Sequence, residues 1–128
     1  MAAPITAFYA GVIGLLLLAL SYQVVRNRRR AGVSLGSGGD TDLERAIRAQ
    51  ANLVEYAPMI LFMMALVELA GASAWLLHGC GGLLVVSRVL HATGLAGKRS
   101  VSPGRKFGIA GTWIVLLVIS VAAIVTAT

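Results

Sequence analysis

The stretch that decides the fold is residues 42–58, DLERAIRAQANLVEYAP, which carries charged side chains into an apolar segment that continues to Leu69. At about 100° per residue, Arg48, Asn52 and Glu55 lie within a narrow arc of one helical face, with Arg45 beside it. Charged groups near hydrocarbon are costly, and they persist where they face a protein interior, a partner or a water-filled site. The stretch therefore predicts a membrane-spanning helix that contributes to a site.

Composition places the whole chain in the membrane class. Of its 128 residues, 58% are hydrophobic and 12% are charged, whereas a soluble domain carries about 25% charged residues. A spanning helix needs about 20 apolar residues, and four segments meet that need: residues 5–25, 45–69, 74–96 and 107–127. The connections among the last three are short. We predict one domain over residues 1–128, an all-α, integral membrane four-helix bundle.

The basic residues predict the orientation of this bundle. The net charge is +6, and the Lys and Arg residues gather after the first segment and around the join between the third and fourth: Arg26, Arg28, Arg29, Arg30, Lys98, Arg99, Arg105 and Lys106. This is the positive-inside pattern, not a basic face for nucleic acid, so no nucleic-acid partner is expected. Both termini are expected outside the cytoplasm and both basic loops inside it.

Two helix starts can be read from local signals. Thr41-x-x-Glu44 matches a capping box and predicts that the second helix begins near Asp42. Ser102 followed by Pro103 predicts an N-cap and a proline at the first position of the fourth helix.

The second of these starts puts Arg105 in the first helical turn. Backbone amides and the positive dipole end would stabilise an anion or a thiolate there. For Lys106 we favour a lipid-headgroup anchor, and for Arg105 a role in a site.

Cysteine and metal chemistry contribute little. Cys80 is the single cysteine, so no intrachain disulfide can form, and Gly79, Gly81 and Gly82 around it indicate a close helix–helix approach. No metal-binding motif is present in the sequence, and no metal is expected.

Three sequence elements resemble the MAPEG family, membrane-associated proteins in eicosanoid and glutathione metabolism. The family shows Arg-Ala-x-x-Asn-x-x-Glu with a nearby proline, then Arg-x-x-His, then Pro-x-Arg. These positions are filled in order by Arg48, Ala49, Asn52, Glu55, Pro58, Arg88, His91, Pro103 and Arg105. Length and the four-span layout agree as well, so the resemblance covers almost the whole chain.

The resemblance implies a homotrimer in a bacterial inner membrane, with glutathione as co-substrate bound between neighbouring subunits near the cytoplasmic face. It implies that glutathione is contacted by Arg26, Asn52, Glu55 and His91, and that Arg105 is the catalytic residue that stabilises its thiolate. Arg48 and Arg88 are further candidates for binding, and Arg88 could instead pair with Glu55 as a buried ion pair. A lipophilic small-molecule electrophile would arrive from the bilayer and be attacked by the thiolate.

Some positions depart from the family. Prostaglandin-synthase-like members carry an arginine where this chain has Ala51, and tyrosines where it has Leu95 and Ile109. Eicosanoid synthesis is therefore not expected, whereas a glutathione transferase, or a member that uses another thiol or none, stays open. Two alternatives are a non-catalytic membrane scaffold and a small proton-coupled multidrug transporter. Such transporters carry an essential glutamate in the first helix, and residues 5–25 hold no acid.

Overall fold

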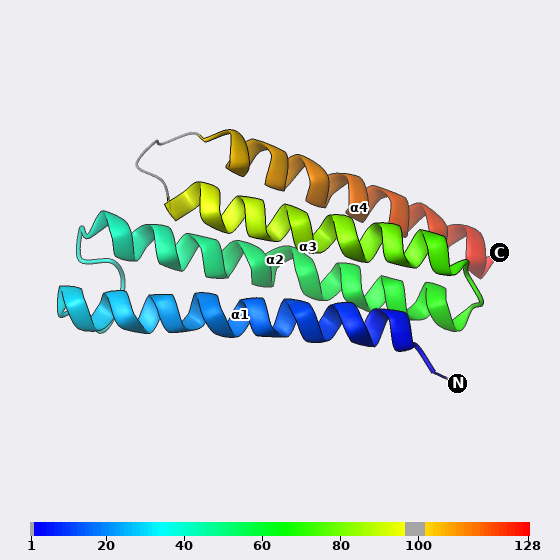
Figure 1. Ribbon diagram of the computed structural model, residues 1–128, viewed down its shortest axis with the longest axis horizontal. Helices are drawn as coiled ribbons and strands as arrows, with labels where there is room; N and C mark the ends of the chain where they lie inside the picture. The colour runs from blue at the N-terminus through cyan, green and yellow to red at the C-terminus, as the bar shows by residue number, and fades with distance from the viewer. Residues whose placement is uncertain (1, 97–101) are drawn as a thin grey trace.

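The chain forms four long helices that lie side by side. The computed structural model describes residues 2–96 and 102–128, which contain α1 (Pro4–Ala31), α2 (Thr41–Leu69), α3 (Ala74–Ala96) and α4 (Pro103–Ala127). Consecutive helices run antiparallel (Figure 1). Each is long and apolar enough to cross a membrane, and the described residues contain no strand. The predicted all-α fold with four spans is confirmed at this level.

The core lies around α2 and α3, each of which packs against the other three helices. In the described part of the chain, α1 and α4 do not contact each other. Leu53, Ile60 and Met64 from α2 are buried together with Leu84 from α3 and Ile119 from α4. The buried side chains of α2 thus recur every three or four residues, as expected for one face of a helix.

α1 and α2 differ from the prediction at the end of the bundle where α1 ends and α2 begins, called the basic end here because of its arginines. α1 continues past Val25 to Ala31, where Gly32 with φ 67° ends it and donates its N–H to the Arg28 carbonyl. α2 begins at Thr41, but the predicted capping box is wrong: the cap is Asp40, whose carboxylate accepts from Leu43 N at 2.8 Å. With 28 and 29 residues, against 23 and 25 in α3 and α4, the α1–α2 pair projects farther at this end (Figure 1).

The opposite end of α1 is capped by a distant carboxylate. The N-cap residue Ala3 has no side chain that can accept a hydrogen bond. Instead, Glu68 at the end of α2 accepts from the backbone N–H of Ile5 at 2.9 Å and of Thr6 at 2.8 Å. Free amides at a helix start need such partners, so Glu68 ties the start of α1 to the end of α2.

Glycines bring α3 and α4 into backbone contact. Gly104, Gly108 and Gly111 follow one face of α4, and a Cβ at Gly108 would lie 2.6 Å from the Ser87 carbonyl oxygen and 2.7 Å from the His91 nitrogen. Only glycine allows this distance, because any side chain would overlap the backbone of α3. α4 itself starts as predicted, with Ser102 as N-cap and Pro103 at its first position.

The glycines around Cys80 behave differently from one another. Gly81 lies beneath the Tyr9 ring of α1, so the expected close approach occurs there. A Cβ at Gly79 would meet nothing within 4 Å. Cys80 itself is buried.

Candidate functional site

Arg88 of α3 is the most deeply buried charged side chain of the predicted site, with 2% of its surface exposed. Its Nη1 donates to the Asn52 side-chain oxygen on α2, and its Nη2 donates to the Gly108 carbonyl on α4 at 3.1 Å. The guanidinium also lies 5.9 Å from the centre of the Tyr56 ring. One guanidinium therefore joins three helices.

The partners of Arg88 are all neutral. Within residues 2–96 and 102–128, no carboxylate lies within ion-pair distance of it, and its buried Nε has no hydrogen-bond partner. The alternative pairing of Arg88 with Glu55 is not made in the described part of the chain. Glu55 instead lies 3.7 Å from Arg48, and both side chains are about half exposed.

The predicted arc on α2 is thus divided. Asn52 is 8% exposed and points into the bundle, whereas Arg48 and Glu55 lie on the surface of the bundle. Taking Arg48 as zero, Asn52 stands about 40° toward the buried face and Glu55 about 20° away from it, at about 100° per residue. Only Asn52 reaches the edge that α3 covers.

His91 follows Arg88 by one turn and shares a hollow with Arg105. The hollow measures about 420 Å³ and lies between α3 and α4, with Lys106 at its polar edge and Ile109, Ala110 and Trp113 along its apolar wall. His91 is 5% exposed. Arg105 lies in the first turn of α4, where its backbone N–H donates to Ser102 Oγ at 3.3 Å.

Two aromatic side chains connect this hollow to the Arg88 cluster. The Trp113 indole N–H donates to the Tyr56 hydroxyl at 3.2 Å, which links α4 to α2. Sequence reasoning did not single out Tyr56, Trp113 or Gly108. The spacing of Gly104 and Gly108, four residues apart in an apolar helix, was the available signal for the close approach of α3 and α4.

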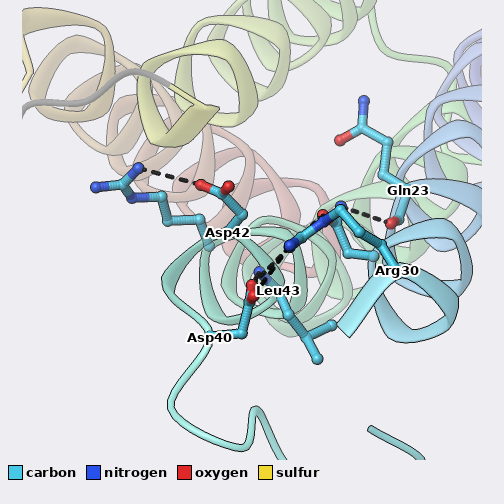
Figure 2. Close-up of polar contacts among 7 residues, drawn as sticks. Gln23, Arg30, Asp40, Asp42 and Leu43 are labelled. Carbon is cyan, nitrogen blue, oxygen red and sulfur yellow. Dashed lines mark hydrogen bonds and ion pairs between the residues drawn. The ribbon is translucent and has the colours of Figure 1, made fainter. Parts of the chain in front are cut away.

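Arg26 lies in a different hollow from His91 and Arg105. It lines a hollow of about 370 Å³ between α1 and α2 at the basic end, together with Arg30 and Arg45. Figure 2 shows Arg30 reaching from α1 toward Asp40, whose carboxylate also accepts from the Leu43 N–H. The predicted site residues therefore form three groups. The first is Asn52 with Arg88 and, one turn on, His91 and Arg105; the second is Arg48 with Glu55; the third is Arg26 by itself.

The described residues offer no alternative metal chemistry. No group of three or more His, Cys, Asp or Glu side chains in residues 2–96 and 102–128 could hold a metal ion. What the arrangement provides is a buried cation, a buried imidazole and a second guanidinium at a helix start. These groups favour a negatively charged ligand.

Comparison with known proteins points to one family. A model of the MAPEG family matches residues 6–125. Two similar relatives, both described as inner membrane protein YecN, come from Escherichia coli strain K12 and from strain O6:H1. Each is 36% identical over 118 residues, which covers 92% of this chain and 88% of the relative. No solved structure matches the chain.

Proposed function

Because this integral membrane protein belongs to the MAPEG family, we propose that it is a membrane-bound glutathione transferase. It would activate the glutathione thiol for attack on lipophilic electrophiles. The description of its relatives as inner membrane proteins supports a bacterial inner membrane as its location, with the basic loops in the cytoplasm.

The observation that carries this proposal is the buried Arg88 with neutral partners. Taking a guanidinium out of water costs several kcal/mol unless a counter-charge compensates it, and a charge in a spanning helix usually marks a functional site. Glutathione carries two carboxylates and one ammonium group, so its net charge is negative. A bound glutathione carboxylate would supply the counter-charge that this subunit does not place beside Arg88.

The hollow lined by His91 and Arg105 suits thiolate formation and attack on the electrophile. A thiolate beside the Arg105 guanidinium at the start of α4 would accept charge-assisted hydrogen bonds that the neutral thiol cannot match. The sulfur would then form a bond to the electrophilic carbon while the leaving group departs with its bonding electrons. Ile109, Ala110 and Trp113 provide an apolar wall for the electrophile.

The exposed pair of Arg48 and Glu55 supports assembly. Both belong to a membrane-spanning helix and are about half exposed in a single chain. Glu55 lies farther along α2 than Arg48, by about 10 Å at about 1.5 Å per residue, and an ion pair exposed to lipid at that depth is unfavourable. We propose that a second subunit covers it in the homotrimer that the family resemblance implies. Native mass spectrometry in mild detergent tests this, and a spectrum with monomers and dimers alone would contradict it.

The direct test of binding is calorimetric titration of glutathione into the detergent-solubilised protein and into Arg88→Met. We expect the variant to lose at least about tenfold in affinity, because hydrogen bonds to charged groups contribute about 1.5–3 kcal/mol each. The Arg88→Met variant should stay folded, since removing the Arg88 guanidinium leaves no buried charge without a counter-charge. Arg29→Gln, at an exposed position of α1, is the matched control for the change in charge.

The test of thiol activation is the thiolate absorbance that appears on adding glutathione. The wild type should show it at pH 7, and Arg105→Leu should reduce it while glutathione still binds. If the wild type binds no glutathione, the protein is a scaffold in which the Asn52–Arg88–Gly108 contacts only hold three helices together.

A further inference from the structure

A second hollow lies between α1 and α2, at the end of the bundle where α1 ends and α2 begins, and Arg26 is the one residue lining it that the family resemblance assigns to glutathione. It measures about 370 Å³ and is formed mainly by α1 and α2, with Ala92 of α3 at its inner side. Arg26, Arg30 and Arg45 line it, together with Asp42. Arg30 is paired with Asp40 and Arg45 with Asp42, so three guanidinium groups meet two carboxylates and the surplus is one positive charge.

The basic wall of this hollow is held in place by neighbouring contacts. Arg30 binds Asp40 at 2.7 Å and Asn27 at 3.2 Å, so its guanidinium is fixed at the rim (Figure 2). Arg45 lies 3.6 Å from Asp42, a looser contact at the surface. Arg26 adds a third guanidinium on the α1 side. Arginine is suited to phosphate, because its planar fork binds two oxygens at once.

The floor of the hollow is small and apolar. Ala46 and Ala49 of α2 and Ala92 of α3 line it, and both α2 alanines are buried. Methyl side chains leave depth where larger residues would fill the space. The basic rim and the alanine floor together match a charged group that is attached to an apolar body.

The position of the hollow along α1 indicates its depth in the membrane. It lies where the apolar part of α1 ends and a run of arginines begins, which is the level of lipid headgroups in the positive-inside orientation. We propose that this hollow binds the phosphate group of an anionic membrane lipid, with Arg26 and Arg45 on the phosphate oxygens and the lipid body over the alanine floor. This inference concerns a ligand other than glutathione and shares only Arg26 with the contacts that the family resemblance implies.

The proposal is tested by titrating short-chain phosphatidylglycerol, and phosphatidylcholine as the neutral counterpart, into the detergent-solubilised protein and counting bound lipids by native mass spectrometry. Phosphatidylglycerol should bind more tightly. Arg45→Gln should weaken it about fivefold, the factor that corresponds to about 1 kcal/mol per basic residue near an anionic surface. Arg29→Gln is the matched control, because Arg29 is exposed on the same turn region of α1 and lies outside the hollow.

A second variant changes the shape of the hollow without changing the charge of its lining. Ala92→Leu should fill the floor and weaken phosphatidylglycerol binding, with thermal unfolding measured beside it to confirm the fold. Arg45→Gln keeps the proposal falsifiable if Ala92→Leu does not fold.

Three results would overturn the proposal. If Arg29→Gln weakened phosphatidylglycerol binding as much as Arg45→Gln does, the lipid would be attracted to the basic surface in general and not to this hollow. Displacement by inorganic phosphate at the same concentration would mean a site for a soluble anion. An equal loss of glutathione affinity in Arg45→Gln would mean that the hollow belongs to the glutathione site, where the family resemblance places Arg26.

Discussion

The two helix pairs of this protein are held together in different ways. α1 and α2 are joined by polar side chains: Glu68 at one end, Arg30 with Asp40 at the other, and a Gln50–Ser21 hydrogen bond of 2.9 Å between them. α3 and α4 are joined by backbone contact at glycines. Long side chains can adjust their reach, whereas two touching backbones cannot separate without losing their contact.

This difference matches where the two hollows lie. His91 and Arg105 line one hollow beside the glycine contact, so the backbone geometry of that contact fixes the relative position of the two residues. A site that stabilises a thiolate needs such fixed placement. The basic hollow lies on the pair joined by side chains, and lipid binding tolerates that looser arrangement.

The largest expected effect is on the glycine contact. Gly108→Ala should lower the free energy of unfolding by about 1–3 kcal/mol, because the added methyl overlaps the Ser87 carbonyl and the His91 nitrogen. Thermal or denaturant unfolding in detergent measures it. Gly79→Ala is the control: its Cβ meets nothing within 4 Å, and alanine is the better helix former. Equal destabilisation by both substitutions would show that the contact is not tight.

A smaller effect is expected where Glu68 caps α1. Glu68→Gln keeps one acceptor oxygen and loses the charge, so stability should fall by about 1 kcal/mol. The local measurement is amide hydrogen exchange at Ile5 and Thr6, which should become faster. Glu44→Gln changes the same charge at an exposed position of α2 and should leave both amides unaffected. Unchanged exchange in Glu68→Gln would contradict the capping role.

The smallest effect is expected at Asp40. Hydrogen bonding by the Arg30 guanidinium, and then by the Leu43 N–H, lowers the pKa of the Asp40 carboxyl below its ordinary value. The folded pKa thus lies below the unfolded value of about 3.9. Its contribution to stability is complete above that value and is lost as the pH falls through the folded pKa. The unfolding midpoints of the wild type and Asp40→Asn should therefore converge as the pH drops below about 4. A constant difference down to acid pH would exclude this origin.

Local signals in the sequence were enough to predict the helices. Apolar length gave the four spans, and Ser102 with Pro103 gave the start of α4, because both signals depend on neighbouring residues. The cap of α2 was misassigned for the same reason: Thr41 and Glu44 fit a local motif, but Asp40 is the residue that Arg30 holds from α1.

Contacts between distant residues could not be predicted this way. The arc of Arg48, Asn52 and Glu55 followed from helical periodicity, but which edge α3 covers depends on packing, and only Asn52 lies on it. Glu68 and Thr6 are separated by 62 residues, and no periodic pattern links them. The neutral surroundings of Arg88 likewise arise from three helices at once. The roles predicted for Arg26, Arg48, Asn52, Glu55, Arg88, His91 and Arg105 stay predictions.

The greater length of α1 and α2 determines where a protease can reach the chain. At about 1.5 Å per residue, α1 and α2 measure about 42 and 44 Å, which exceeds the about 30 Å of a hydrocarbon core. Their excess projects at the basic end and carries the connection at residues 32–40 with it (Figure 1). A protease added to that side would meet this hairpin first. Cleavage there would divide the chain into two helical pieces while leaving Arg88, His91 and Arg105 on one of them.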